Sequence, residues 1–417
     1  MGVCDGLRFE SRDFLTRKSC NLIKVTIISY YGKWKCGNSK KKGLFCRPLQ
    51  EDIRQYHMPL RAARNSPPSC QGKLTAIDLF SGCGGLTVGL KRAGFRVIAA
   101  VEMERKARTT YLLNHPEVVV YDMDVRVLSV KAVMSKLNIR PGELALLAGC
   151  PPCQGFSRLR TRNQSTSVSD PRNDLISEII RFTKGLMPKA LMLENVPALQ
   201  QDSKFRQLCN ELEKLGYAYS VNVLDVADYS VPQRRKRLVL LASRVHSPEP
   251  AKKSNVRLTV RTALYGLDHP KKTGDNLHAV PENRSERTKA LVRLIPRNGG
   301  SRSDLPNKFQ LACHKRSDGF QDVYGRMAWD EVSPTITSGC INPSKGRFLH
   351  PTQNRTITLR EASLLQGFPS NYKFDVSHGK EAIALMIGNA LPPPFVEAHA
   401  KVMRRSIRSA MQNTSSS

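Results

Sequence analysis

The sequence predicts an α/β fold built on a doubly wound sheet, followed by a smaller, loop-rich region. An apolar run, Leu74 to Phe80, passes through a glycine-rich turn into a helical pattern at Leu86 to Ala93, the arrangement of nucleotide-binding turns in such sheets. A second apolar run, Arg96 to Val101, ends in the acidic residue Glu102. Further strand-like runs follow, and each ends in a polar or reactive residue.

Length and charge narrow the class of protein. The 417 residues suffice for a large core and a second domain. Lys and Arg number 66 against 35 Asp and Glu, a net charge of +31 that favours nucleic acid as partner, with an anionic membrane surface as the second choice. No run of about 18 apolar residues is present, so no membrane span is expected. Eleven cysteines without a secretory signal favour free thiols and a cytoplasmic, nucleoid-associated protein.

Residues 1–72 are expected to form a basic, poorly ordered extension. Cys20, Cys36, Cys46 and His57 match no zinc-ligand spacing. The segment Ser66 to Ser69 contains two prolines and is typical of a linker.

The glycine-rich turn favours a nucleoside cofactor without a pyrophosphate. Thr87 stands where a dinucleotide-binding motif has its third glycine. Glu102 follows Gly82 by twenty positions, the place of an acidic residue that holds ribose hydroxyls. S-adenosyl-methionine has a nucleoside and no pyrophosphate, although a purely structural turn would use the same glycines.

The stretch Gly149 to Ser157 presents a cysteine for chemistry. It follows an apolar run, Leu144 to Ala148, and two prolines keep the backbone extended just before Cys153. A thiolate is a strong nucleophile, and a polar, basic loop follows it. Cys150 and Cys153 also form a C-x-x-C pair, which allows a redox or zinc site; the next cysteine, Cys209, stands alone, which disfavours zinc.

Glu194 is the candidate general acid. It ends the apolar run Ala190 to Leu193, and Pro197 closes the turn behind it. Burial raises the pKa of a carboxyl group, which suits it to protonate a ring nitrogen. In an open α/β sheet, ligands bind at the carboxyl ends of the strands. The residues expected at this edge are Phe80, Gly82, Glu102, Asp124, Cys153 and Glu194.

The second half of the chain is basic. Val231 to Arg237 contains a charge run that suits either a solvated face or a phosphate contact. From residue 248 to about 350 the chain is rich in loops and in basic residues, with one helical pattern at Glu286 to Leu294. A helix from Leu359 ends before Gly367-Phe368-Pro369, and another is expected from Ile383 to Arg404.

Together these motifs resemble the DNA (cytosine-5) methyltransferases of the bacterial restriction-modification type. The resemblance extends from Leu74 to Val402 and rests on DLFSGCGG at 78–85, GCPPCQGFS at 149–157, ENV at 194–196, Q-x-R-x-R at 233–237 and GNALPP at 388–393. It implies a Rossmann-like, S-adenosyl-methionine-dependent catalytic domain at 73–247 and a target-recognition domain at 248–350. Residues 351–405 are expected to return to the catalytic domain, and 406–417 to form a tail.

The resemblance also implies the site residues. The catalytic residues would be Cys153, Glu194 and Arg235, with Arg235 holding the base near Glu194. The cofactor-binding residues would be Phe80, Ser81, Gly82, Gly84, Gly85, Glu102, Met103, Asp124, Val125, Pro151, Asn389 and Leu391. Asp122 remains an alternative to Asp124, and Leu391 stands where the family usually has valine. The substrate-binding residues would be Gln154, Ser157, Asn195, Gln233 and Arg237, and no metal is expected.

The implied reaction is methyl transfer to carbon 5 of a cytosine flipped out of double-stranded DNA, through a covalent bond to Cys153. The absence of a large regulatory region suggests a bacterial modification enzyme, acting as a monomer and functionally paired with a restriction endonuclease.

Three other classes of protein remain as alternatives. A tRNA methyltransferase would carry a Cys-Phe-Thr signature that is not found. An NAD(P) oxidoreductase is disfavoured by the glycine spacing, and a DNA-binding protein with a relic site by the intact site residues.

Overall fold

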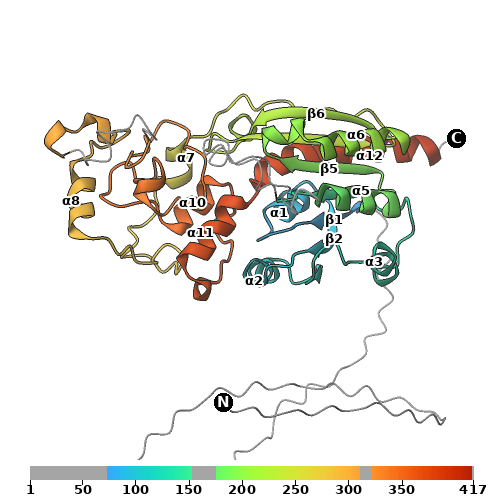
Figure 1. Ribbon diagram of the computed structural model, residues 1–417, viewed down its shortest axis with the longest axis horizontal. Helices are drawn as coiled ribbons and strands as arrows, with labels where there is room; N and C mark the ends of the chain where they lie inside the picture. Colours follow the sequence, from blue (N-terminus) through green and yellow to red (C-terminus); the bar gives the residue numbers. More distant parts are fainter. Residues whose placement is uncertain (1–72, 153–174, 310–321, 416–417) are drawn as a thin grey trace, which may run out of the picture. The chain divides into compact units, whose positions relative to one another are not determined.

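A seven-stranded sheet forms the centre of the computed structural model, which describes residues 73–152, 175–309 and 322–415 (Figure 1). The strand order is β3-β2-β1-β4-β5-β7-β6. Neighbours from β3 to β5 pair in parallel, whereas β7 is antiparallel to both β5 and β6. The strands are β1 Thr75–Leu79, β2 Arg96–Val101, β3 Val119–Tyr121, β4 Leu146–Gly149, β5 Ala190–Asn195, β6 Ala218–Asp225 and β7 Lys236–Ser243. The predicted doubly wound α/β fold is confirmed.

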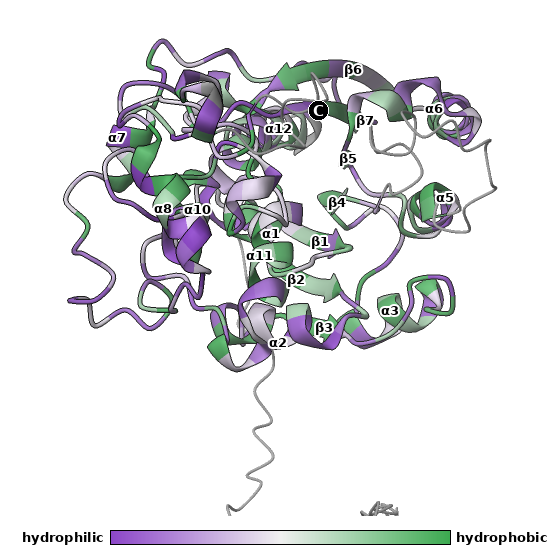
Figure 2. Ribbon diagram, turned by 60° about the vertical axis from the view of Figure 1, so that its left-hand side comes forward, coloured by the Kyte–Doolittle hydropathy of each residue, from purple (hydrophilic) through white to green (hydrophobic). Residues whose placement is uncertain are grey.

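Helices cover both faces of this sheet. They are α1 Gly85–Arg92, α2 Arg105–Asn114, α3 Val130–Leu137, α5 Leu175–Leu186, α6 Ser203–Lys214 and α12 Pro393–Ser415. Successive strand residues point to opposite faces: Leu147 packs with α3, α5 and α6, whereas Leu146 and Ala148 pack with α1 and α12. Strands buried on both faces are largely apolar, as Figure 2 shows for β4.

Several predicted elements have the expected bounds. The run from Arg96 to Val101 is β2, and the helical patterns at Leu175–Leu186 and Glu286–Leu294 are α5 and α8. The apolar run that contains β1 is one residue longer than the strand at each end.

Two further apolar clusters hold the predicted recognition region and the segment after it. The helices of this part are α7 Val260–Leu264, α8 Glu286–Leu294, α10 Leu359–Leu365 and α11 Lys380–Asn389. The larger cluster lies around α7, α10 and α11, and the smaller one lies under α8. α7 and α11 both pack on α10, and all three lie close together in Figure 1. Short 3-10 helices are η2 Pro197–Gln201, η3 Val226–Tyr229, η4 Arg302–Asp304, η5 Asn307–Phe309, η6 Pro343–Lys345 and η7 Val376–His378.

Buried Arg326 ties this region together without a carboxylate partner. Its guanidinium donates to the carbonyls of Val292 (2.7 Å) and Ile295 (3.0 Å) at the end of α8. It also donates to the carbonyl of His350 and the side chain of Asn354 (2.6 Å). Five fixed donors allow one arginine to join segments that are distant in sequence.

The C-terminal part differs from the prediction in two respects. The helix expected from Ile383 to Arg404 is two helices, α11 and α12, because Pro392 and Pro393 interrupt the helical hydrogen bonds. Pro393 is the first residue of α12, a position where proline is favoured. The expected tail from residue 406 is wrong as far as Ser415, because α12 continues to that residue and buries Ile407 against the sheet.

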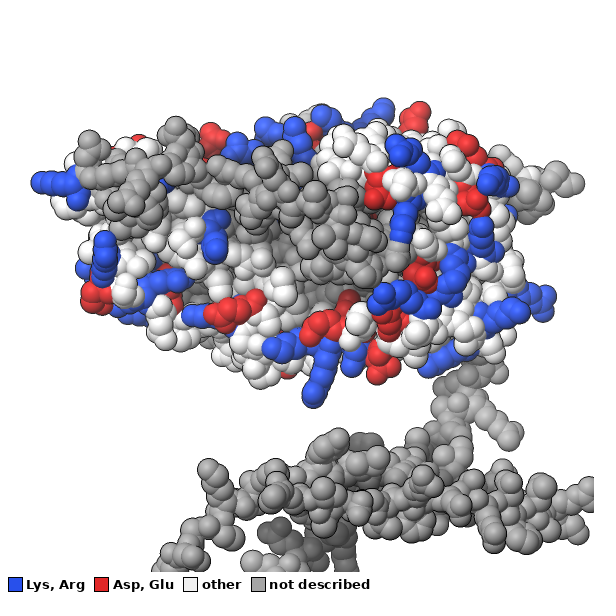
Figure 3. Space-filling model, in the orientation of Figure 1, with Lys and Arg blue, Asp and Glu red and all other residues white. Residues whose placement is uncertain are grey.

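Charged side chains are scattered over the face shown in Figure 3, where lysines and arginines are interspersed with acidic residues. None of the helices in the described part of the chain is long and apolar enough to cross a membrane. Within the same part, no group of three His, Cys, Asp or Glu residues is arranged to hold a metal ion.

Candidate active site

The glycine-rich turn between β1 and α1 adopts a left-handed backbone. Phe80, Gly82 and Gly84 have φ values of 63°, 54° and 97°. This conformation is easy for glycine and uncommon for a residue such as Phe80. The Gly84 amide donates to the Ser81 carbonyl (2.9 Å), which closes the turn. The turn therefore lies at the carboxyl end of β1, with the start of α1 directly behind it.

Glu102 is bonded to this turn. Its carboxylate accepts from the Gly82 amide (2.7 Å) and from the Glu104 amide (2.8 Å). Burial raises the pKa of Glu102 above its ordinary value, and the two backbone amides oppose that shift. A carboxylate offers about four acceptor positions, so the two that remain suit the hydroxyl groups of a ribose.

The neighbouring strand ends complete one side of this site. Met103, after β2, is 63% exposed and offers an apolar contact for a purine ring. Asp124, after β3, is paired with Arg126, and this contact lowers the pKa of Asp124. Asp122 is more exposed and lies 3.9 Å from the nearest guanidinium nitrogen of Arg108. Val125 is buried beneath them. A glycine turn, a carboxylate with free lone pairs and an exposed methionine fit S-adenosyl-methionine.

The predicted nucleophile follows β4. The turn begins at Cys150 and Pro151, and the Asn195 side-chain amide donates to the Pro151 carbonyl (2.9 Å). This bond connects the ends of β4 and β5, which are parallel neighbours in the sheet. Cys153, Gln154 and Ser157 lie outside the described residues.

Glu194, near the end of β5, pairs with Arg237. Their carboxylate oxygen and guanidinium Nε are 2.7 Å apart, and both side chains are largely buried. The sequence analysis expected Arg235 to hold the base near Glu194. The guanidinium that pairs with Glu194 is that of Arg237, while Arg235 is close enough for the Glu194 charge to act on its pKa. β5 and β7 pair so that Glu194 lies opposite Val239, and Arg237 lies two positions away on the same face of β7.

Arg235 makes a different set of contacts. Its guanidinium donates to the carbonyls of Ile336 and Gly388, each at 3.0 Å. Burial lowers the pKa of Arg235 to about 9. It therefore joins the start of β7 to two distant segments, one in the recognition region and one at the end of α11.

Gln233, predicted to bind substrate, is completely buried and bonded to protein groups. Its side-chain oxygen accepts from the Ile336 amide (2.9 Å), and its amide nitrogen donates to Gln366. Thr335 also donates to the carbonyl of Arg234 (2.7 Å). Gln233 and Arg235 thus fasten the segment around Ile336 to the catalytic sheet, a contact that sequence reasoning missed.

The final motif meets the glycine-rich turn. A Cβ on Gly85 would lie 2.6 Å from the Leu391 carbonyl oxygen, so only glycine fits there without movement. Leu391 is buried, and Asn389, the last residue of α11, is exposed. The motif at 388–393 therefore lies against the glycine-rich turn at the predicted cofactor site.

Asp78 is a further buried acid beneath this turn that sequence reasoning did not single out. It is fully buried within β1 and accepts from the Thr87 hydroxyl (2.6 Å). Burial raises the pKa of Asp78 from 3.8 to about 7. An acidic residue in the middle of an apolar strand was the available signal.

Comparison with known proteins extends this description. The sheet order, and a glycine turn bonded to an acid on the next strand, define a nucleoside-binding α/β enzyme. The sequence model of the C-5 cytosine-specific DNA methylase family matches residues 74–405. The chain belongs to this family, whose members methylate cytosine in DNA with S-adenosyl-methionine as donor.

Individual relatives are similar to this chain over most of their own length. The type II methylase M.HgiDII of Herpetosiphon aurantiacus is 33% identical over 350 residues, covering 79% of this chain and 94% of its own. The type II methyltransferase M1.HphI of Haemophilus parahaemolyticus is 33% identical over 342 residues, covering 79% and 86%. A solved structure of a DNA modification methyltransferase encoded within an E. coli prophage aligns with a TM-score of 0.62 at 24% identity, covering 81% and 100%. This likeness shows the fold.

Proposed function

We propose that this chain methylates carbon 5 of a cytosine flipped out of a specific double-stranded DNA sequence, through a transient covalent bond to Cys153. The observation that supports this most strongly is the connection between β4 and β5. The hydrogen bond from Asn195 to the Pro151 carbonyl ties the strand that carries Glu194 to the turn that leads into Cys153.

The cofactor would be held at the ends of β1, β2 and β3. Gly82 and Glu102 would contact the nucleoside, with Met103 against the purine ring and Asp124 near its amino group. The bond between Gly82 and Glu102 supports this role because it fixes the carboxylate beside the turn before any ligand binds. When bound, S-adenosyl-methionine supplies an electrophilic methyl group.

The chemistry of the base would fall to three residues. A cytosine must leave the stack before its ring can be reached. The Cys153 sulfur forms a bond to carbon 6, while Glu194 hydrogen-bonds to and protonates the ring nitrogen. Carbon 5 accepts the methyl group, and the ring nitrogen returns its proton to the Glu194 carboxylate. Solvent water then takes the proton from carbon 5, and the electrons of that bond form the double bond between carbons 5 and 6 as the sulfur–carbon bond breaks and returns the thiolate. The Arg237 guanidinium holds the Glu194 carboxyl in position; Arg235, bonded to two backbone carbonyls, takes a positioning role.

The biological context we propose is protection of host DNA against a restriction endonuclease. This rests on the relatives, which are named type II methylases and methyltransferases. Methylome sequencing of a host that expresses the protein would give the recognition sequence. Absence of 5-methylcytosine at any defined site would contradict the proposal.

The decisive assay follows a radiolabelled methyl group from S-adenosyl-methionine to duplex DNA, with tRNA as the competing substrate. Cys153→Ser is expected to abolish transfer while the circular dichroism spectrum remains that of the wild type. DNA containing 5-fluorocytosine should trap a stable adduct that maps to Cys153. A normally active Cys153→Ser variant, or an adduct on another residue, would refute the covalent route. Transfer to tRNA alone would refute DNA as the substrate.

A further inference from the structure

A cavity of about 510 Å³ lies mainly in the predicted recognition region. It is bounded by the loop before α8, by one side of α8 and by residues 353–359, which lead into α10. Among the residues that the structure describes, none of those assigned above to the cofactor or to cytosine lines it. Its volume lies within the range of about 300–1,000 Å³ that is typical of small-molecule sites.

The lining of this cavity is strongly basic. Six of its side chains are lysine or arginine, and one, Glu282, is acidic. The Glu282 carboxylate is already engaged: it pairs with Arg284 (2.8 Å) and accepts from the Thr356 hydroxyl (2.9 Å) and amide (3.2 Å). This acid therefore leaves little charge to balance the remaining cations.

The six cationic groups fall into three that form ion pairs and three for which the described residues provide none. Arg284 pairs with Glu282, Arg355 with Glu361 and Lys289 with Glu286. Across the described ranges, Lys271, Arg293 and Lys380 form no ion pair. They come from the loop, from α8 and from the start of α11, so their charges reach the cavity from three different elements.

Part of the wall is apolar. Val280, Pro281, Val292, Ile341 and Ile357 line it. An apolar wall beside unbalanced cations suits a ligand with a flat organic part and an anionic group. A mononucleotide has both features.

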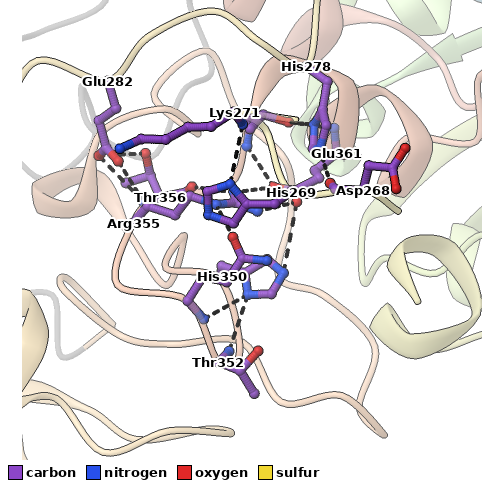
Figure 4. Close-up of polar contacts among 12 residues, drawn as sticks. Asp268, His269, Lys271, His278, Glu282, His350, Thr352, Arg355, Thr356 and Glu361 are labelled. Carbon is purple, nitrogen blue, oxygen red and sulfur yellow. Dashed lines mark hydrogen bonds and ion pairs between the residues drawn. The ribbon is translucent and has the colours of Figure 1, made fainter. Parts of the chain in front are cut away.

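A network of buried polar groups fixes the floor of the cavity (Figure 4). His278 bonds to the Thr358 hydroxyl (2.7 Å) and to the Asp268 carbonyl (2.9 Å). Glu361 accepts from the Thr358 amide (2.7 Å) and forms a two-point pair with Arg355 (2.6 and 2.7 Å). These bonds hold the walls in place without a ligand, so the cavity is preformed.

We propose that this cavity is a second nucleotide site, in which Lys271, Arg293 and Lys380 surround a phosphate group and the apolar wall contacts the sugar or base. The bound nucleotide can be either a free nucleotide or one nucleotide of the DNA substrate. In either case the site is separate from the methyl-transfer centre.

Calorimetric titration of the full-length protein with thymidine 5′-monophosphate tests this proposal. The protein is first saturated with S-adenosyl-homocysteine, so that the cofactor site does not take up the probe. The double variant Lys271→Ala/Lys380→Ala is expected to bind at least about tenfold more weakly than the wild type. Ala279→Trp, which fills the cavity without changing its charge, should have a similar effect. Irradiated 4-thiothymidine 5′-monophosphate should label residues within 268–293 or 353–359.

The matched control is Lys131→Ala/Lys252→Ala, which removes the same charge from two exposed positions outside the cavity. Its affinity for the probe should stay within about twofold of the wild type. If the wild type does not bind the probe, a tenfold loss of duplex DNA affinity in the cavity variant but not in the control supports DNA as the source.

The proposal is wrong if the cavity and control variants behave alike with both ligands, or if the photolabel maps elsewhere. Failure of methyl transfer would contradict the proposed function and would leave the proposal for the cavity unaffected. Cys153→Ser should bind the probe with unchanged affinity, because the substitution removes none of the three cationic groups assigned to the cavity.

Discussion

Replacing Arg235 and Arg237 one at a time by methionine should show which of them has a structural role and which a catalytic one. Arg235→Met leaves the buried carbonyls of Ile336 and Gly388 without their donor. Each unsatisfied group costs about 1–3 kcal/mol, and removal of a buried charge offsets part of that sum. We expect a net loss of roughly 2–4 kcal/mol in the free energy of unfolding, seen as a fall of several degrees in melting temperature.

Arg237→Met should affect turnover more than folding. Arg237 contacts Glu194 at 2.7 Å, so its loss leaves the catalytic carboxyl without its partner. Removal of support for an acid–base group typically lowers the rate by about 10²–10⁴-fold. We therefore expect a large fall in kcat with a smaller change in melting temperature than in Arg235→Met.

The matched control is Arg234→Met, because Arg234 is exposed and lies in the same segment. Thermal unfolding and single-turnover methyl transfer would be measured for all three variants. A stable but inactive Arg235→Met, together with an active Arg237→Met, would overturn the assignment and restore the role that the sequence gave Arg235.

Three further outcomes are expected. Glu102→Gln should weaken binding of S-adenosyl-homocysteine by about 10–100-fold in calorimetric titration, because a charge-assisted contact is lost; unchanged affinity would remove Glu102 from the site. Asp78 holds a proton up to pH about 7 in the folded protein, whereas the unfolded chain releases it near 3.8, so this group makes stability fall as pH rises between these values. Urea unfolding should show that the wild type loses as much as about 4 kcal/mol more than Asp78→Asn between pH 4 and pH 7.5, and parallel curves would contradict the shift. Gly85→Ala should cost about 1–3 kcal/mol, because its Cβ would lie 2.6 Å from the Leu391 carbonyl, whereas Gly274→Ala, with no atom within 4 Å, should be nearly neutral in the same assay.

Much of the fold could be predicted from the sequence because the five strands from β3 to β5 in the sheet are short, largely apolar and parallel. The run from Arg96 to Val101 predicts β2 with the bounds observed. Strands of this kind end at one edge of the sheet, so the succession of polar residues after them predicts which side chains come near one another. The bond between Gly82 and Glu102 joins two residues that this argument placed at that edge.

The order of polar residues along the sequence does not tell which of Arg235 and Arg237 contacts Glu194. Gln233, Arg235 and Arg237 alternate along an extended chain, so periodicity assigns them the same side. Which one meets Glu194 depends on the register between β5 and β7, where Glu194 lies opposite Val239. Register between antiparallel strands is set by tertiary packing, and the motif contains no signal for it.

The recognition region was harder to predict for a related reason. Its segments are held by polar side chains that donate to distant backbone carbonyls, as Arg326 does to Val292 and His350. Such contacts follow no period in the sequence. The same holds for the Ile336 segment, whose amide and carbonyl bond to Gln233 and Arg235. Because Arg237 follows two residues later and contacts Glu194, a shift of the Ile336 segment on DNA would act on the start of β7 and so on the catalytic carboxyl. In the proposed reaction, the bonds that hold the Ile336 segment against the sheet would therefore connect DNA binding to catalysis.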